Sequence, residues 1–180
     1  MVSAAQSEDR TGLGLVRGSY EEALKMIGHS SPVIFAAATV NWGMIKYYAS
    51  LIEDGNPSYW DEEFAGEEWG GIIAPPGMLM AWLMPVPWDP EGVPVSPLIA
   101  TQLPLPGETL INVATETEYL HPIRVGDHLN MTDAVVEITP EKKTRLGTGH
   151  FITTVATYRD QFGEVKAKNT NHMFRYTTKG

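Results

Sequence analysis

The feature that most constrains the fold is a change in the hydrophobic period after residue 108. From there on, apolar and polar residues alternate, a pattern typical of β-strands with one buried face. The expected strands are residues 109–120, 127–139, 146–160 and 164–177. The breaks "HPIRVG", "PEKKTR" and "DQFG" carry turn chemistry. Because these connections are short, the pattern predicts an antiparallel meander.

The first part of the chain predicts two helices and a short strand. Residues 20–28 begin with acids, end in glycine and hold apolar residues at helical spacing. The apolar run 32–40 indicates a buried strand. Asn41 can cap a following helix. That helix must end before Asn56-Pro57, because a residue that precedes proline is disfavoured in the α conformation.

The segment "GGIIAPPGMLMAWLM", residues 70–84, is apolar on all sides after its two prolines. Such a pattern is typical of a helix buried inside a domain. Pro75 and Pro76 would fix its start, and Pro85 and Pro87 would end it. One buried apolar helix and a long antiparallel sheet together predict an α+β hot-dog fold, in which the sheet wraps around the helix.

Length and composition indicate one ordinary globular domain. The chain has 180 residues, of which 43% are hydrophobic and 19% charged, which excludes a disordered chain. We expect a single domain over 1–180, with a flexible N-terminal segment over 1–18. Nine of the thirteen prolines lie between positions 75 and 106. Residues 85–107 are therefore expected to form a long ordered loop.

Several classes of function are disfavoured. The net charge of −9 argues against nucleic-acid binding, and the lack of cysteine excludes thiolate chemistry. The five histidines show no metal-ligand spacing. No apolar run approaches the roughly 20 residues that span a bilayer. The start "MVSAAQSEDRTG" lacks the pattern of a signal peptide, so we expect a cytoplasmic protein without membrane contact.

The charge is unevenly distributed along the chain. Residues 1–120 hold 4 Lys and Arg against 16 Asp and Glu, whereas residues 121–180 hold 9 against 6. This asymmetry reflects either chance and an acidic surface, or a set of cations offered to an anionic ligand. The cations in question are Lys142, Lys143, Arg145, Lys166, Lys168 and Arg175.

The acidic segment "IEDGNPSYWDEEFA", residues 52–65, invites a calcium interpretation that fails. A calcium loop that began at Asp54 would need glycine at its sixth position and glutamate at its twelfth, where the chain has Tyr59 and Ala65. A solvated surface accounts for four other acids: Glu62, Glu63, Glu67 and Glu68. For Asp54, a turn-forming role and a chemical role both remain open.

Three segments together resemble a known family: residues 52–65, the stretch "GGIIAPPGMLMAWL", and "EYLHPIRVGDHL". In this order and spacing they are similar to the MaoC-like enoyl-CoA hydratases and dehydratases. The similarity is to the branch of the fatty-acid-synthase-type dehydratase N-terminal domain. It covers residues 20–177. The patterns "V-N-x-x-M-I", "I-A-P-P-x-M" and "W-L-M" also resemble hydratase subunits of bacterial steroid side-chain degradation.

The resemblance implies a catalytic segment with one departure. The family motif D-x-N-P-x-H-x-D is matched by Asp54, Asn56-Pro57 and Asp61, but Tyr59 stands at the position of the catalytic histidine. In the family, the aspartate and the histidine activate the water that adds to the double bond. A free tyrosine, with a pKa near 10, is a poor general base.

The resemblance also implies an oxyanion site and a substrate site. Gly77 matches the residue whose backbone N–H receives the thioester oxygen. The implied substrate-binding residues are Pro76, Met78, Trp82, Lys142, Lys143 and Arg145. No cofactor is implied, since coenzyme A enters as part of the acyl-CoA substrate. The expected assembly is a hot-dog homodimer, or a heteromer with a related MaoC-like chain.

Three functions follow from these features. The chain is a supporting, acyl-CoA-binding subunit of a hydratase for a bulky or steroid-like acyl group, and a partner supplies the catalytic pair. Alternatively, it is a self-sufficient hydratase in which Asp54 works with Tyr59 or with a histidine such as His121 or His150. The third possibility is a hot-dog thioesterase that uses Asp54 or Asp61, or a noncatalytic acyl-CoA-binding module.

Overall fold

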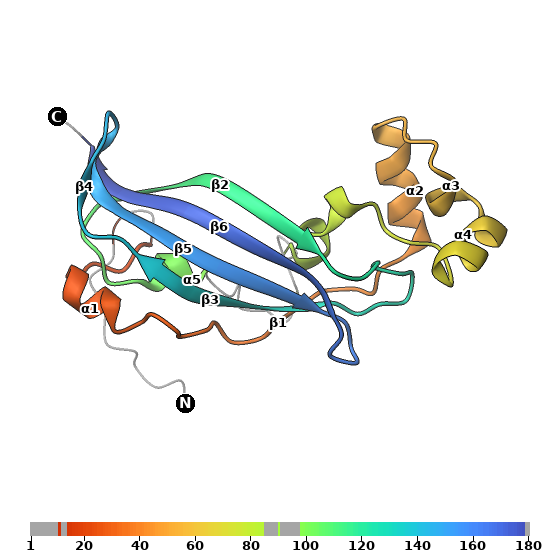
Figure 1. Ribbon diagram of the computed structural model, residues 1–180, viewed down its shortest axis with the longest axis horizontal. Coiled ribbons are helices and arrows are strands. Elements are labelled where there is room, and N and C mark those ends of the chain that lie inside the picture. Colours follow the sequence, from red (N-terminus) through yellow and green to blue (C-terminus); the bar gives the residue numbers. More distant parts are fainter. Residues whose placement is uncertain (1–10, 12–13, 85–89, 91–97, 179–180) are drawn as a thin grey trace.

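The computed structural model describes residues 11, 14–84, 90 and 98–178. A long antiparallel sheet dominates, and a group of short helices lies beyond one of its ends (Figure 1). Its strands are β1 (Ile34–Phe35), β2 (Thr109–Tyr119), β3 (Asn130–Ile138), β4 (Lys142–Lys143), β5 (Gly147–Arg159) and β6 (Val165–Thr178). The predicted α+β class and its four long strands are confirmed. No described helix is long and apolar enough to cross a membrane.

The strand order differs from the expected meander. The order is β1-β3-β5-β6-β2, with β4 paired to β5. The strands β3, β5 and β6 do follow one another through short connections. However, β2 pairs with β6 and not with β3, because residues 120–129 carry the chain to the opposite edge of the sheet. The strand β2 therefore forms one edge.

The helices are α1 (Tyr20–Leu24), α2 (Trp42–Leu51), α3 (Pro57–Trp60), α4 (Glu62–Trp69) and α5 (Ile99–Gln102). As predicted, Asn41 caps α2, since its Oδ1 accepts the N–H of Met44 at 3.0 Å. The helix also ends before Asn56-Pro57, through Glu53 in a left-handed conformation with φ of 55°. The ends of this helix thus follow from its own residues.

The strand expected over 32–40 is mostly absent. Only Ile34 and Phe35 form a ladder, with β3. Beyond them, the N–H groups of Ala36 and Val40 donate to the carbonyls of Leu129 and Asp127. The chain here follows the loop that precedes β3, so regular pairing stops after two residues.

The prediction of a single central helix over 70–84 is wrong. The structure has two single turns of 3-10 helix, η1 (Pro76–Met78) and η2 (Ala81–Leu83). Met78 donates its N–H three residues back, to Pro75. Met80 and Met84 are 59% and 68% exposed. Only one side of the segment packs on the core. The fully apolar pattern therefore did not indicate a helix buried on all sides.

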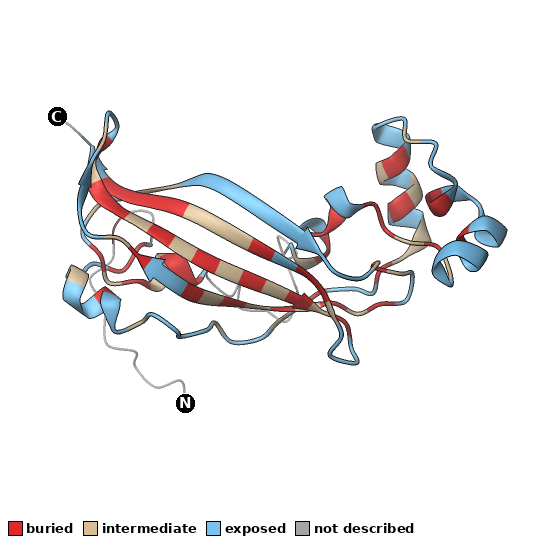
Figure 2. Cartoon of the chain, viewed as in Figure 1, coloured by how far each residue is buried: buried red, intermediate tan, exposed pale blue. Residues whose placement is uncertain are grey.

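The core consists of two clusters that share β3 and β5. One cluster lies toward the helices and includes Ile45, Met78 and Tyr158. The other lies toward the opposite end and includes Leu103 and Ile152. Figure 2 shows the alternation of buried and less buried residues along β5, whereas most of β2 is exposed.

Two segments that were expected to lack helices and strands can be compared with the structure where it describes them. In the segment 1–18, expected to be flexible, Leu15 and Val16 are buried, and the Val16 N–H donates to the Thr101 carbonyl at 3.0 Å. In the predicted loop 85–107, the last part forms α5. Leu103 and Leu105 follow it and are buried. The rest of that loop, 85–89 and 91–97, lies outside the described residues.

Candidate functional site

The segment after α2 is shaped by hydrogen bonds of its own polar residues. The Asp54 carboxylate accepts the N–H of Asn56 at 3.0 Å, and the Asn56 side chain accepts the N–H of Ser58 at 3.0 Å. The Trp60 indole donates to the Asp54 carbonyl at 2.7 Å. This geometry is compatible with both the turn-forming and the chemical role of Asp54. Its half-buried carboxylate shapes the turn through Oδ1, while Oδ2 has no partner among the described residues.

Tyr59, at the position of the family histidine, is buried in α3. Burial raises the pKa of its phenol, and the negative charge of Asp54 raises it further, while Asn56 opposes the shift. The hydroxyl therefore stays protonated at neutral pH. It can donate a hydrogen bond, but it cannot serve as the base that activates water.

Two tyrosines that the sequence did not single out meet at the predicted oxyanion residue, Gly77. A Cβ placed on Gly77 would lie 2.4 Å from the Tyr48 hydroxyl oxygen. The Tyr119 hydroxyl donates to the Pro76 carbonyl at 2.8 Å. Burial raises the pKa of Tyr119 as well, with a smaller contribution from Tyr48. Hydroxyl groups from α2 and β2 thus surround the start of η1.

The sequence contains a signal for the proximity of Tyr48 to the site but none for that of Tyr119. Tyr48 lies on the helix that leads into Asp54, so its proximity to the motif was visible in the sequence. Tyr119 is far from the motif in sequence and reaches Pro76 only because β2 lies at the sheet edge nearest η1.

Asp61, the last residue of the motif, is used by the fold. Its Oδ1 accepts the N–H groups of Glu63 and Phe64, at 3.0 and 3.1 Å, and caps α4. This role argues against Asp61 as the carboxylate of a thioesterase. The neighbouring acids of α4 are exposed, as expected for a solvated surface: Glu62, Glu63, Glu67 and Glu68.

A mainly apolar pocket of about 220 Å³ adjoins the start of η1. Its lining includes Trp69, Pro76, Tyr119 and His121. The pocket therefore brings one of the two candidate histidines next to the predicted oxyanion residue. The Nδ1 atom of His121 lies 4.0 Å from a carboxylate oxygen of Glu164.

The second candidate, His150, is remote from this pocket. It is buried near α1, stacks on Tyr20, and shares a hydrogen bond of 2.9 Å with the Thr139 carbonyl. These contacts are those of a structural residue.

The cations among the predicted substrate-binding residues are not next to Asp54 either. Lys142 and Lys143 form β4, and Arg145 follows in the turn to β5. Figure 1 shows β4 at the end of the sheet opposite α2, α3 and α4. Within one chain, the structure does not bring these three residues to the acidic segment.

Two of the other cations are unavailable to a ligand, which corrects the interpretation of the basic C-terminal third. Lys166 is 1% exposed and Arg175 is 0% exposed. Lys166 pairs with three carboxylates, those of Asp127, Asp160 and Glu164. Arg175 donates to three backbone carbonyls. Both hold the fold together, whereas Lys168 is exposed.

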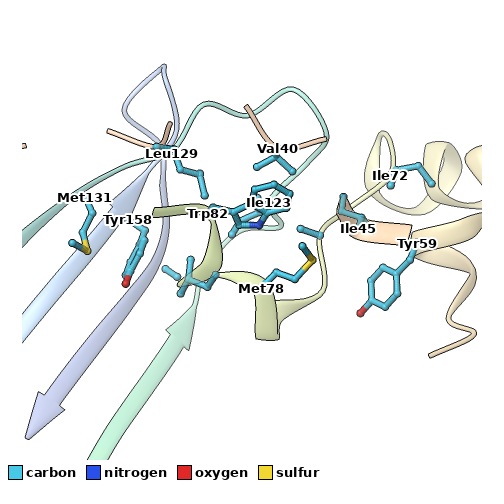
Figure 3. Packing of buried hydrophobic residues seen from close by; sticks show 14 of the residues in the cluster. Val40, Ile45, Tyr59, Ile72, Met78, Trp82, Ile123, Leu129, Met131 and Tyr158 are labelled. Carbon is cyan, nitrogen blue, oxygen red and sulfur yellow. The ribbon is translucent and has the colours of Figure 1, made fainter. Parts of the chain in front are cut away.

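Met78 and Trp82 belong to the same buried cluster as Tyr59 (Figure 3). The buried indole Nε1 of Trp82 has no hydrogen-bond partner among the described residues. Over the same part of the chain, no three acidic or histidine residues are arranged to hold a metal ion.

Comparison with known proteins assigns a family and a fold. The model of the family "FAS1-like, dehydratase domain region" matches residues 25–168. The chain is similar to a probable enoyl-CoA hydratase alpha subunit of Thermomonospora curvata, 37% identical over 148 residues. It is also similar to the 3-oxo-4,17-pregnadiene-20-carboxyl-CoA hydratase alpha subunit of Mycobacterium tuberculosis, 29% identical over 132 residues.

These matches cover 78% and 72% of this chain but only 46% and 42% of the two relatives. The chain thus spans less than half the length of each.

Solved structures show the fold. A chain of the ChsH1–ChsH2 complex from Mycobacterium tuberculosis aligns with a TM-score of 0.71 at 23% identity, over 89% of this chain and 92% of that one. A MaoC-like dehydratase from Rhodospirillum rubrum aligns at 0.58 and 24%, over 86% and 94%. The predicted hot-dog fold and MaoC-like resemblance are confirmed.

Proposed function

Because the chain belongs to the FAS1-like family of dehydratase domain regions, we propose that it is an acyl-CoA-binding subunit of a 2-enoyl-CoA hydratase. The reaction adds water across the trans-2 double bond and yields a 3-hydroxyacyl-CoA. The observation that carries this proposal is the link through Tyr48, which lies against Gly77 and acts on Tyr59 as Asp54 does, together with the raised pKa of Tyr59, which prevents it from acting as a base.

The chemistry divides into two tasks. Water must lose a proton as its oxygen adds to C3, and negative charge grows on the thioester oxygen. The backbone N–H of Gly77 lies in the first turn of η1, where N–H groups have no acceptor within the helix, so it can stabilise that charge. Asp54 can hold the water, but Tyr59 cannot take its proton. A partner that carries an Asp/His pair would complete the site.

Features of the surface support a partner chain. No other described strand pairs with the outer edge of β2, which leaves backbone groups free for another strand. Nearby, α2 exposes three apolar side chains on one face: Met44, Tyr47 and Leu51. A related hot-dog chain that paired with β2 would cover both this strand edge and the exposed apolar face of α2. The alpha-subunit names of the relatives agree with a heteromer.

Reconstitution tests the proposal. The chain alone should bind a bulky trans-2-enoyl-CoA in a calorimetric titration and leave the double bond intact. A MaoC-like chain with a complete Asp/His motif should then restore hydration, followed as loss of the conjugated double bond. Failure to bind any acyl-CoA, alone or in the complex, would contradict the proposal.

The position of His121 favours a second candidate function, a self-sufficient hydratase. Its pocket also contains Pro76, and so lies beside Gly77. If His121 supplies the missing base, the chain alone turns over substrate, and His121→Gln removes that activity. The exposed His29 provides the matched control, His29→Gln. Activity of the lone chain that survives His121→Gln would exclude this mechanism.

A further inference from the structure

A strip of polar side chains crosses the inner face of the sheet between the two core clusters. It consists of Thr117 on β2, Asn169 on β6, Tyr158 and Thr154 on β5, and Asp133 on β3, and is called here the polar strip. Cross-strand pairing places these residues on one face, because Asn169 pairs with both Thr117 and Ala156, and Ala156 pairs with Asp133. Apolar residues fill the same face on both sides.

The outer half of the polar strip is a chain of hydrogen bonds. The Thr117 hydroxyl donates to Asn169 Oδ1 at 2.6 Å. The Asn169 amide then donates to the Tyr158 hydroxyl oxygen at 3.3 Å. Because Tyr158 accepts this bond, its own proton remains for another acceptor, and none is found among the described residues. Each group thus orients the next toward the interior.

The inner half ends in polar groups without partners. Asp133 is 4% exposed and Thr154 is fully buried. The Thr154 hydroxyl lies near enough to lower the pKa of Asp133, but neither Asp133 Oδ1 nor this hydroxyl forms a hydrogen bond of good geometry with any described residue. Burial of an unpaired polar group costs free energy, so an unfilled cluster of this kind needs a reason.

The protonation states agree with a donor site. Burial raises the pKa of Asp133, and the neighbouring Thr154 opposes this only in part. Burial, and then the charge of Asp133, raise the pKa of Tyr158 to about 12. The phenol is therefore neutral, and a carboxyl with a raised pKa gains a proton more readily.

The polar strip is connected to the candidate site through Tyr119. This residue follows Thr117 by two positions on β2, on the same face, and its hydroxyl reaches the Pro76 carbonyl. From β2 to β3 there are three inter-strand steps of about 4.8 Å, so the inner end lies roughly 14 Å from the edge strand. Figure 3 shows Tyr158 in the same buried cluster as Met78 and Trp82.

We propose that the polar strip binds an oxygen atom of the acyl group, a hydroxyl or a carbonyl, that lies far from the thioester. The inference rests on the proposed function and adds the class of substrate. A short acyl chain cannot span the distance from Gly77 to Asp133. A purely apolar long chain would offer no acceptor to the Tyr158 proton and no further polar partner to the neighbouring Asp133 and Thr154.

A matched pair of ligands tests this inference. The full chain is titrated with a long trans-2-enoyl-CoA and with its ω-hydroxy analogue of equal length. The oxygenated ligand should bind about fivefold more tightly, the typical value of one net hydrogen bond. Asp133→Asn combined with Tyr158→Phe should bring the two affinities close together. Glu137→Gln, an exposed carboxylate on the same strand, should keep the difference.

The outcomes separate the two proposals. Equal affinity for both ligands in the unaltered protein would overturn the role of the polar strip and leave the hydratase proposal standing. If neither ligand binds, the proposed function fails, and the polar strip inference fails with it. If the strip only stabilised the fold, the double variant would change the melting temperature and not the ratio of affinities.

Discussion

The hydroxyl of Tyr48 lies directly against Gly77, with no room for a side chain between them. A Cβ on Gly77 would stand 2.4 Å from the hydroxyl oxygen and 3.4 Å from the ring carbon that carries it. A side chain at this position would therefore have to displace the Tyr48 ring, and the constraint on Gly77 comes from this close approach and not from its backbone angle. The contact joins α2, which leads to Asp54, to the turn that presents the oxyanion N–H.

We expect Gly77→Ala to displace the Tyr48 ring and lower turnover in the assembled hydratase about 10-fold or more, because small displacements at a reacting centre are costly. Removal of the hydroxyl restores ordinary contact, so the Gly77→Ala/Tyr48→Phe double variant should recover part of the loss. The measurement is a double-mutant cycle on kcat/KM. Strictly additive effects would show that the contact has no role in the site.

The histidine that the family motif lacks can be restored. In the Tyr59→His variant the lone chain should gain enoyl-CoA hydration of about 100-fold over its own background, the usual contribution of a general base. Tyr59→Phe should not gain activity. The two variants are compared in the same spectroscopic assay. No gain in Tyr59→His would mean that residue 59 does not face the reacting water.

The four long strands could be predicted from sequence because each is nine or more residues long. The order of the strands could not, since the ten residues from 120 to 129 permit either edge. The prediction of a central helix over 70–84 was wrong for a related reason. Its apolar pattern was correct at Met78 and Trp82, but the prediction assumed packing on all sides, which the fold does not provide for Met80.

The buried Lys166 should control acid stability. Its amine lies 3.1 Å from Asp160 and 3.5 Å from Asp127. Burial alone would raise the pKa of Asp160, but Lys166 and backbone donors together lower it below the ordinary 3.8. A lowered carboxyl pKa stabilises the fold above the ordinary value, and this stabilisation is lost as the pH falls through the folded pKa.

We therefore expect Lys166→Met to reduce the free energy of unfolding by about 3 kcal/mol at neutral pH, since it leaves carboxylates buried without a cation. The deficit should shrink as the pH falls below about 4, where those carboxylates take up protons. Urea denaturation at several pH values measures both effects. A deficit that does not depend on pH would contradict this electrostatic account.

Glu53 offers a prediction on stability. It ends α2 with a φ of 55°, a conformation that costs roughly 1 kcal/mol for a residue with a side chain. Glu53→Gly should raise the free energy of unfolding by about 0.5–1 kcal/mol, whereas Glu53→Ala should not. Thermal unfolding measures both variants. If Glu53→Gly and Glu53→Ala raised the stability equally, the gain would come from loss of the Glu53 charge and not from the backbone conformation.

For the candidate site, sequence motifs located Asp54, Tyr59 and Gly77 but not what surrounds them. The state of Tyr59 depends on its burial in the folded chain, and the contact of Tyr119 with Pro76 depends on strand order. Such relationships have no local pattern. The polar strip was hidden for the same reason, because its members come from four strands.

The most direct measurement mixes the purified lone chain with a long trans-2-enoyl-CoA and follows the conjugated double bond and free thiol together. The supporting-subunit account predicts binding of the acyl-CoA, an intact double bond and no thiol release. Hydration by the lone chain that disappears in Asp54→Asn would contradict it and make this chain a complete enzyme. Thiol release would instead identify a thioesterase.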